Sequence, residues 1–491
     1  MRVSVEVGRN KVMHSEFLKL RAGLLLLVVY GLLAGLLPTA TAASEDVPST
    51  ITVSGTQWGQ STCYIGAVEG SSRFTIADLK DLGINTFHMY GGMTRWEPQD
   101  DSPVYGSPSI NQIKANPNVI NWAYWDNIMT NPPAGSDYWW TGNGPLWQGN
   151  ARTIFRELKA AGIRPVVTLR NHNTVTNPAW APNPPTTQAD WNVWWEHVFA
   201  TVYWLNVRND YNVNDFEIHN EPNLPDHGWG GTFQQYIAFA RATHDAIDYV
   251  YKTYLPGRTY HLFAPSANTS SSWTAALLQQ APDAFDNLSI HDYAQNNFIH
   301  VVEQAHQAQN QLGKTNYPLW VTEWGSYSIT DKYSSISMGI KMIQNLIQGS
   351  QPGNDYVYGS QIFALYDYAT RPLGLIASDG TRRVDYYALR MAIRALQGCR
   401  PTFQSMTTNP NLLALTTRDA QGHLYLLVTN QDTTQTANVS ADLSALTSGG
   451  NGTIWQFDYY HSDQQTSTFS FTGGHLAFSV PANGALLLKI A

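Results

Sequence analysis

The sequence predicts an α/β protein, a (β/α)8 TIM barrel followed by a C-terminal antiparallel β-sandwich domain. Over residues 43–398, short apolar runs rich in β-branched and aromatic residues alternate with longer segments of helical periodicity. Such alternation indicates a mainly parallel sheet with helices outside it. Over residues 399–491, strand-like runs follow one another with turn signals between them, which is typical of a sandwich.

Eight short runs are expected to form the barrel strands. In chain order they are Tyr64–Val68, Asn85–Tyr90, Arg164–Arg170, Phe216–His219, Tyr260–Ala264, Leu288–His291, Leu319–Thr322 and Gln361–Leu365. Helices are expected at Arg152–Ala161, Gln234–Tyr251 and Ser334–Ile347, where apolar residues recur at three-and-four spacing. Eight βα units fit a closed barrel with enlarged loops. An open, doubly wound sheet is the alternative, but no glycine-rich phosphate turn follows the first run.

Six later runs are expected to form the sandwich. They are Leu412–Thr417, Leu424–Asn430, Asn438–Leu443, Thr453–Tyr459, Thr468–Phe471 and Leu486–Ile490. The run Ile51–Ser54 offers this domain an additional N-terminal strand. The sandwich either binds polysaccharide or braces the barrel, and bracing is the default because a fold alone does not imply a function.

Residues 1–42 are expected to be a signal peptide. A basic segment ends at Arg21, an apolar stretch runs from Ala22 to Leu37, and small residues at 40–42 suit cleavage. The protein is therefore expected to be secreted, with an uncleaved signal anchor on the outer face of the membrane as the alternative. Removing this segment, which carries +3, takes the formal charge from −8 to −11. A mildly acidic chain without runs of Lys or Arg is a poor candidate for nucleic acid or for stable membrane association.

The chain has two cysteines, Cys63 and Cys399. Because there is no CxxC pattern, a zinc site is not expected. Cys63 directly precedes the first barrel strand, and Cys399 follows the last barrel helix, which should end at the same side of the barrel. Export exposes thiols to oxidising conditions, so we expect these two residues to form a disulfide.

The segment Gly91–Asn150 is far longer than a typical βα connection of about 2–6 residues. It contains six tryptophans and starts at the barrel face where active sites lie. We expect a lid or cleft wall in which Trp139 and Trp140 offer flat rings to a substrate. The alternative is a subdomain in which the tryptophans form an aromatic core.

Two glutamates stand at matching places in the predicted barrel. Glu221 in "EIHNEPNL" follows the fourth strand, and Glu323 in "WVTEWG" follows the seventh, 102 residues later. Both carboxylates are therefore expected at one mouth of the barrel. Either motif alone is equally well a strand cap or half of a buried ion pair. Together they suit glycosidic bond cleavage, which needs one protonated carboxyl group and one carboxylate.

These motifs resemble those of the clan A glycoside hydrolases, in which "NEP" follows strand four and a glutamate follows strand seven. The resemblance covers most of residues 55–395. It is strongest to family 39 in "EIHNEPNL", "TEW" and "PLGLIASDGTRRVDYYAL" (residues 372–389), and next to family 5 in "IHDY". The final segment, ending "VPANGALLLKI", is also similar to the sandwich of such enzymes.

The resemblance implies roles for four residues. Glu221 is expected to be the acid/base and Glu323 the nucleophile. Asn220 is expected to bond the sugar 2-hydroxyl group, and Tyr293 to orient the nucleophile.

Three further residues are candidates for sugar contact: His172 and His291 stand at positions of sugar contact in such enzymes, and Trp324 follows the expected nucleophile. For each histidine a structural role is an equal alternative. For Trp324 the alternatives are a platform for a sugar ring and a place in the core.

The sequence departs from the clan at two places. Where the clan usually has an arginine near the end of strand two, this chain has His88, with Arg95 and Arg170 as other substitutes. After strand eight, Tyr366 and Tyr368 stand where a tryptophan commonly forms the floor of the sugar site. Both departures bear on the subfamily and substrate more than on the reaction class.

The sequence as a whole predicts a secreted retaining β-glycosidase that hydrolyses β-linked oligosaccharides or polysaccharides without a cofactor. A catalytically silent carbohydrate-binding protein on the same scaffold is the alternative, supported by the departure at His88. A metal-dependent hydrolase is less favoured, because no HExxH motif or clustered His/Asp ligand set appears.

Overall fold

The computed structural model describes residues 47–70, 73–131, 146–147, 150–170, 180–224, 229–268, 272–293, 298–325, 333–368 and 371–491. The predicted signal peptide, His172, Trp139 and Trp140 lie outside these ranges. Among the residues described, no helix combines the length and the apolar character needed to cross a bilayer.

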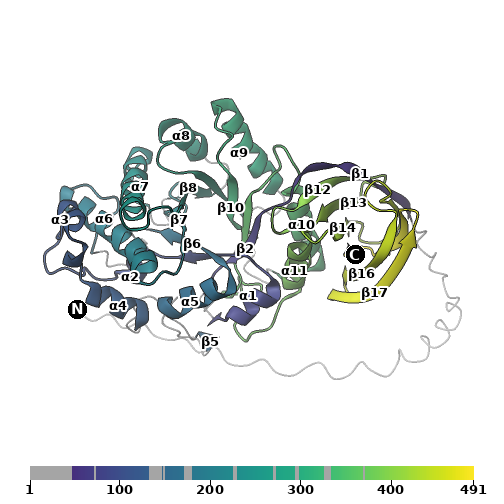
Figure 1. The fold of residues 1–491 in the computed structure, drawn as a ribbon, viewed down its shortest axis with the longest axis horizontal. Coiled ribbons are helices and arrows are strands. Elements are labelled where there is room, and N and C mark those ends of the chain that lie inside the picture. Colours follow the sequence, from purple (N-terminus) through teal and green to yellow (C-terminus); the bar gives the residue numbers. More distant parts are fainter. Residues whose placement is uncertain are drawn as a thin grey trace, which may run out of the picture. The chain divides into compact units, whose positions relative to one another are not determined.

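Eight parallel strands close into a barrel, which confirms the predicted fold class (Figure 1). The strands are β2 (Tyr64–Val68), β4 (Thr86–Tyr90), β6 (Arg164–Leu169), β7 (Asp215–Ile218), β8 (His261–Asn268), β9 (Asn287–Asp292), β10 (Leu319–Trp324) and β11 (Gly359–Ile362). Each strand pairs with the next one in this order, and β11 pairs with β2 to complete the ring. The eight runs predicted from the sequence are these strands, with ends displaced by a few residues.

Helices follow the strands of the barrel along the chain. They are α1 (Ile76–Leu82), α2 (Met93–Trp96), α3 (Ile110–Ala115), α4 (Trp122–Thr130), α5 (Ala151–Ala161), α6 (Gln188–Tyr203), α7 (Phe233–Tyr254), α8 (Ser272–Gln280), α9 (Phe298–Leu312), α10 (Ile336–Gln348) and α11 (Val384–Leu396), with the short helices η1 (Pro117–Val119) and η2 (Trp204–Arg208). Two short strands, β3 (Arg73–Phe74) and β5 (Leu146–Trp147), lie outside the barrel sheet. The three predicted helices are α5, α7 and α10. Polar side chains fix where α5, α6 and α7 begin, because Asn150, Thr187 and Thr232 accept hydrogen bonds from backbone N–H groups of the first turn.

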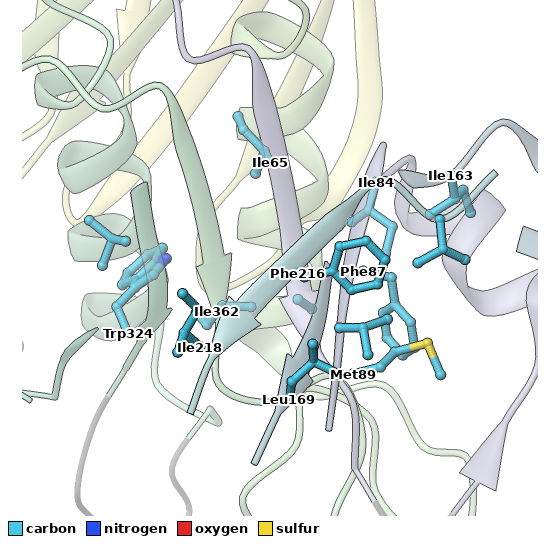
Figure 2. Packing of buried hydrophobic residues seen from close by; sticks show 14 of the residues in the cluster. Ile65, Ile84, Phe87, Met89, Ile163, Leu169, Phe216, Ile218, Trp324 and Ile362 are labelled. Carbon is cyan, nitrogen blue, oxygen red and sulfur yellow. The ribbon is translucent and has the colours of Figure 1, made fainter. Parts of the chain in front are cut away.

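Two separate sets of apolar side chains pack on the two sides of the barrel wall. Between strands and helices lies the main core, part of which Figure 2 shows with Phe87, Leu169 and Ile218 buried on three neighbouring strands. Inside the barrel lies a layer of four side chains from alternate strands: Tyr64, Val166, Phe263 and Trp320. The ring centroids of Tyr64 and Trp320 are 5.2 Å apart and those of Phe263 and Trp320 are 4.9 Å apart. This layer fills the barrel below the strand C-termini, so that polar side chains occupy the opposite end.

The long segment Gly91–Asn150 contains α2, α3 and α4 in its described part. Trp96 and Trp125 are buried in the main core, and Trp122 stacks on Tyr203 with ring centroids 5.1 Å apart. These three tryptophans therefore form an aromatic core, which was one of the two interpretations of this segment. The predicted contribution of Trp139 and Trp140 concerns residues outside the described ranges.

The C-terminal residues form a strand-rich, mostly antiparallel sheet, as predicted. Its order is β17–β16–β19–β14–β13–β12–β1–β15–β18. The bounds are β1 (Val47–Gln60), β12 (Pro401–Thr407), β13 (Leu412–Arg418), β14 (Leu424–Asn430), β15 (Ala437–Asp442), β16 (Gly449–Phe457), β17 (Ser462–Thr472), β18 (His475–Val480) and β19 (Gly484–Ile490). The N-terminal strand β1 lies in this sheet, antiparallel to β12 and parallel to β15, as the run Ile51–Ser54 suggested.

Two strands of this sheet were not predicted. β12 begins with Pro401, which has no N–H to donate and weakens a strand assignment. β18 is short, and of its six residues only Leu476 and Val480 are buried. β12 forms because it pairs with β1, and β18 forms because it pairs with β15, although the local sequence of each gives a weak strand signal.

Helices α10 and α11 of the barrel pack against the C-terminal sheet. Gly339 of α10 lies against Phe457, since a Cβ atom added there would meet the phenyl ring at 2.6 Å. On α11, Arg390 Nε and Arg394 Nη1 donate to the buried carboxylate of Asp463 at 2.7 and 2.6 Å. Close packing and ion pairs therefore join the sheet to the barrel, which favours a bracing role.

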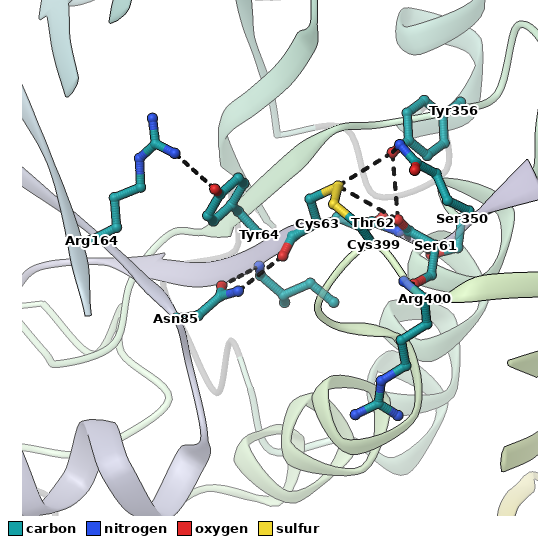
Figure 3. The surroundings of a disulfide bond; sticks show 12 residues. Ser61, Thr62, Cys63, Tyr64, Asn85, Arg164, Ser350, Tyr356, Cys399 and Arg400 are labelled. Carbon is teal, nitrogen blue, oxygen red and sulfur yellow. Dashed lines mark hydrogen bonds between the residues drawn. A yellow bond between two sulfur atoms is a disulfide. The ribbon is translucent and has the colours of Figure 1, made fainter. Parts of the chain in front are cut away.

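A disulfide joins Cys63 to Cys399, the pairing that the sequence suggested (Figure 3). The two half-cystines are 336 residues apart in the chain. Backbone hydrogen bonds surround the bridge: Gly398 N donates to the carbonyl of Cys63 at 3.2 Å. The side-chain amide of Asn85 donates to the Cys63 carbonyl and accepts from Ile65 N, at 2.9 and 3.0 Å. The bridge therefore ties the first barrel strand to the segment after α11.

We expect the double variant Cys63→Ser/Cys399→Ser to lower the free energy of unfolding by about 2–5 kcal/mol, because the bridge restricts the unfolded chain. Chemical denaturation of the variant and the wild type measures this difference, and reduced wild type should match the variant. Thiol titration of the denatured, unreduced wild type should find no thiol. Two free thiols per chain would show that the bridge is absent.

Candidate active site

The C-terminal ends of the barrel strands bring several polar side chains to one place. Glu221 follows β7, Glu323 is the second-to-last residue of β10, and Tyr293 directly follows β9. Tyr90 and Asn268 are the last residues of β4 and β8. All five are buried or nearly so, although their strands span more than half the ring. The barrel thus brings two carboxylates and three hydrogen-bonding groups together at one mouth.

Glu221 is held in a strained turn. Its φ is 43° and that of His219 is 65°, both in the left-handed region that residues other than glycine seldom adopt. Neighbouring segments fix this turn, since His219 N donates to Leu169 O at 2.8 Å and Glu221 N donates to Ser266 O at 3.1 Å. The turn directs the Glu221 side chain toward the ends of β8 and β9, where its partners lie.

Oε1 of Glu221 has two polar partners. Nδ2 of Asn268 donates to it at 2.6 Å, and Nδ1 of His291 lies 3.1 Å away. Asn268 is itself fixed by Asn223, which exchanges two hydrogen bonds with its backbone at 3.0 and 3.1 Å. The carboxyl group therefore has one defined orientation.

Glu323 receives two phenolic hydroxyl groups. The hydroxyl of Tyr90 donates to Oε1 and that of Tyr293 donates to Oε2. Strict alternation along β10 would direct Glu323 outward, because Trp320 points into the barrel and Val321 packs in the outer core. The pairing of β10 with β9 shifts register between Val321 and Glu323, which turns the carboxylate inward.

One carboxylate oxygen of each glutamate and a ring nitrogen of His291 all lie within 4.8 Å of one another. Nδ1 of His291 is 3.5 Å from Oε2 of Glu323. Burial disfavours the imidazolium, but the charges of Glu323 and Glu221 prevail and raise the pKa of His291 to about 9. Burial also raises the pKa of Glu323, which the positive charge of His291 opposes and the charge of Glu221 increases. His291 thus supplies a positive charge between two carboxyl groups.

Beneath the site, His88 lies in a buried ion pair with Glu217. Nε2 of His88 is 3.3 Å from Oε1 of Glu217 and 2.6 Å from the Thr168 hydroxyl. Although burial raises it, the pKa of Glu217 falls to about 2 because of the charge on His88. The histidine that stands in place of the usual strand-two arginine therefore has the Glu217 carboxylate as its counterion.

The two arginines near His88 both act on Tyr90. Arg95 donates to the Tyr90 carbonyl and pairs with Glu69 at 2.7 Å. The guanidinium of Arg170 lies over the Tyr90 ring, 5.0 Å from its centroid. Both contacts fix the tyrosine whose hydroxyl donates to Glu323.

The tyrosines after β11 differ in environment. The hydroxyl of Tyr366 contacts the backbone of Thr75 at 3.2 Å rather than Glu221 or Glu323. Tyr368 stacks on Phe363 with ring centroids 5.4 Å apart and donates to Glu69 O at 3.3 Å. Tyr368 is therefore the better candidate for a wall of the site.

The remaining predicted residues fall into three groups. Asn220 is buried beside Glu221, and its Oδ1 has no hydrogen-bond partner among the described residues. Trp324 is buried in the main core, 5.0 Å from the Phe298 ring centroid, which favours its core role. His172, Trp139 and Trp140 lie outside the described ranges.

Sequence analysis missed Tyr90 and Asn268. Tyr90 ends the second predicted strand, so a search for polar residues at strand ends would have found it. Asn268 lies four residues beyond the predicted end of its strand, because β8 continues through Pro265, a residue type that is rare inside strands.

Two groups of side chains have the spacing of metal ligands among the residues described. One is Glu221, His291 and Glu323, and the other is Glu97, Asp100 and Asp101. In the first group Oε1 of Glu221 accepts from Asn268, and the two oxygens of Glu323 accept from Tyr90 and Tyr293.

Residues 212–370 match the family model described as the glycosyl hydrolase catalytic core, and this range contains both glutamates. Comparison with curated proteins gives no match. The part of the chain that holds both glutamates is therefore similar to a glycosyl hydrolase catalytic core, which confirms the resemblance predicted from the sequence.

Three solved structures similar to this chain are glycosidases. A glucosidase from Croceicoccus marinus has a TM-score of 0.66 and 13% identity, with 91% of this chain and 99% of that chain covered. A family 39 enzyme from Xanthomonas axonopodis pv. citri has a TM-score of 0.63 and 16% identity, with coverage of 93% and 99%. A monomeric β-xylosidase from Caulobacter crescentus CB15 has a TM-score of 0.62 and 14% identity, with coverage of 90% and 99%. At these identities the likeness shows the fold alone.

We expect the substitution His291→Gln to reduce the pH dependence of stability. The pKa of His291 is about 9 in the folded protein and about 6.5 when unfolded, so its contribution is complete below pH 6.5 and lost as the pH rises through 9. The wild type should lose about 3 kcal/mol more than the variant between pH 6.5 and pH 9. Chemical denaturation at both pH values measures this difference.

The matched control is His475→Gln, because the His475 side chain is 63% exposed on β18. It should keep the pH dependence of the wild type. Equal pH dependence in the wild type and in His291→Gln would contradict the assignment of a buried imidazolium.

Proposed function

We propose that this protein is a secreted retaining β-glycosidase that hydrolyses β-linked oligosaccharides or polysaccharides by double displacement. The main support is a distance: one carboxylate oxygen of Glu221 and one of Glu323 lie within 4.8 Å of each other. Retaining enzymes have carboxyl groups about 5–5.5 Å apart, whereas inverting enzymes need about 6.5–9.5 Å to admit a water molecule. The spacing supports the retaining mechanism.

The partners of each carboxyl group support the division of roles. Glu323 accepts from two phenols and faces His291, an arrangement that orients a carboxylate and stabilises its charge. In the first step a Glu323 oxygen attacks the anomeric carbon, the bond to the leaving oxygen breaks, and the Glu221 proton moves to that oxygen. In the second step Glu221 takes a proton from water, the water oxygen attacks the anomeric carbon, and the ester bond to Glu323 breaks.

Substrate binding is proposed for residues around this pair. Oδ1 of Asn220 has no hydrogen-bond partner among the described residues, which suits an acceptor for the sugar 2-hydroxyl group. Two of the similar structures are a glucosidase and a β-xylosidase, which supports a β-linked glycan. Secretion is proposed from the basic, apolar and small-residue pattern of residues 1–42. No cofactor is needed, because protein side chains supply the nucleophile and the acid.

A catalytically silent carbohydrate-binding protein is the second candidate. The observation that favours it is His88, which pairs with Glu217 where the clan usually has an arginine beside the nucleophile. Turnover of any aryl β-glycoside separates the two candidates.

We expect Glu323→Ala to lower turnover of an aryl β-glycoside by about 10⁴-fold or more, because it removes the nucleophile. Glu303→Ala is the matched control, since the Glu303 side chain is 50% exposed on α9. It should leave turnover unchanged. Activity in Glu323→Ala equal to that of the control would refute the assigned role.

We expect Glu221→Ala to keep the first step for substrates with an activated leaving group, which needs no protonation. The second step should then be slow, and azide should restore turnover by forming a β-glycosyl azide. Proton NMR of the product first formed by the wild type tests the stereochemistry. An anomer inverted relative to the substrate would overturn the retaining mechanism.

A further inference from the structure

A second cluster of carboxyl groups lies in the segment after β4. Glu97, Asp100 and Asp101 follow α2, and each offers an oxygen within 4.8 Å of the others. Glu97 and Asp101 are buried, with 2% and 6% of their surfaces exposed. Glu196 of α6, with 3% exposed, belongs electrostatically to the same cluster, because its charge acts on Glu97 and the charges of Asp100 and Asp101 act on it. Four carboxyl groups are therefore gathered in a mostly buried place.

The hydrogen bonds around this cluster leave buried oxygens without donors. Oε1 of Glu196 and Oδ1 of Asp101 are shielded from solvent and have no hydrogen-bond partner among the residues described. Oδ2 of Asp101 accepts from Trp125 Nε1 at 3.2 Å, and Oε2 of Glu97 lies 2.7 Å from Nδ1 of His197. A buried carboxylate oxygen without a donor is costly, and such exceptions in folded proteins indicate an ion or a water.

Positive charge is lacking at the cluster among the residues described. Glu97 Oε2 lies 2.7 Å from Nδ1 of His197, and among the described residues no lysine or arginine lies within ion-pair distance of Asp100, Asp101 or Glu196. Burying carboxylates of like charge without a counterion is costly, and a bound cation removes that cost.

We propose that Glu97, Asp100, Asp101 and Glu196 form a calcium-binding site. Oxygen-only ligands suit a hard cation, and Ca²⁺ accepts about 6–8 oxygens in flexible geometry. Zinc and copper prefer nitrogen or sulfur ligands, and the nearby histidine nitrogen Nδ1 is already bonded to Glu97. His197 acts as a positioning residue that orients one ligand.

This site links parts of the chain that are far apart in sequence. Glu97, Asp100 and Asp101 lie between α2 and α3, Trp125 lies on α4, and Glu196 lies on α6. The carbonyl of Asp101 also accepts from Asn121 at 2.9 Å. A cation here stabilises the segment that begins directly after Tyr90, whose hydroxyl donates to Glu323. The site is separate from the catalytic pair and acts on the fold of this segment.

Titration of chelator-treated protein with CaCl₂ tests the proposal independently of enzymatic activity. Isothermal titration calorimetry should give one site per chain with a Kd of about 1 mM or tighter. Saturating CaCl₂ should raise Tm by several degrees, because ligand binding to the native state stabilises it. No binding heat and no change in Tm for the wild type would overturn the proposal. An equal effect of MgCl₂ would overturn the assignment to calcium.

Two variants locate the site. Glu196→Gln and Asp101→Asn should each weaken calcium binding at least about tenfold, through loss of a charged ligand. Neither should prevent folding, because each removes a charge from a repelling cluster, and the Tm in chelator should equal or exceed that of the wild type.

Asp385→Asn is the matched control, because Asp385 is also a buried carboxyl group but lies on α11. It should keep the calcium affinity and the calcium-induced rise in Tm of the wild type. Wild-type affinity in both cluster variants would overturn the proposed location.

Discussion

Two carboxyl groups of like charge are buried next to each other at the barrel mouth, and the surrounding structure compensates them. At such a separation, repulsion in a medium of low dielectric would favour protonation of one group or opening of the site. His291 lies between the two glutamates, Asn268 donates to Glu221, and Tyr90 and Tyr293 donate to Glu323. These donors come from β4, β8 and β9, so the electrostatic balance requires the closed ring of strands. A barrel that failed to close would separate the carboxylates from the groups that stabilise them.

Local irregularities of the backbone place the carboxyl groups in this ring. The left-handed residues His219 and Glu221 form a turn that an isolated peptide would avoid. The shifted register of β10 brings Glu323 to the inner face. Neighbouring strands hold both features, because Glu221 N donates to Ser266 O and β10 pairs with β9. Strain at the site is thus maintained by regular pairing around it.

Support for the mouth comes from both sides of the barrel. On one side, α10 and α11 pack on the C-terminal sheet, and the Cys63–Cys399 bridge ties the first strand to the end of α11. On the other side, α2, α3 and α4 form a layer whose buried tryptophans pack against α6. This layer begins at Tyr90 and includes Arg95, which donates to the Tyr90 carbonyl. The position of a hydroxyl that contacts Glu323 therefore depends on a segment outside the barrel proper.

The sequence by itself determined the fold class and the chemical groups. Alternating apolar runs specified eight strands, because strand and helix periodicities are local properties of a chain. The matched positions of Glu221 and Glu323 after strands four and seven followed from counting those units. The choice between a lid and an aromatic core for Gly91–Asn150 was left open, since both use the same residues.

Only the tertiary structure decided how these groups are arranged. The contacts of Asn268 and Tyr90 with the glutamates join strands that are distant in the chain, and a place at a strand end does not tell which glutamate each residue contacts. The pairing of His88 with Glu217 is likewise a contact between different strands, so the tertiary structure alone decided it. The burial of Trp324 and the inward turn of Glu323 depend on a register shift that the neighbouring strand imposes. Sequence periodicity fixes which residues form each element, but contacts between elements fix the direction and the charge of each side chain.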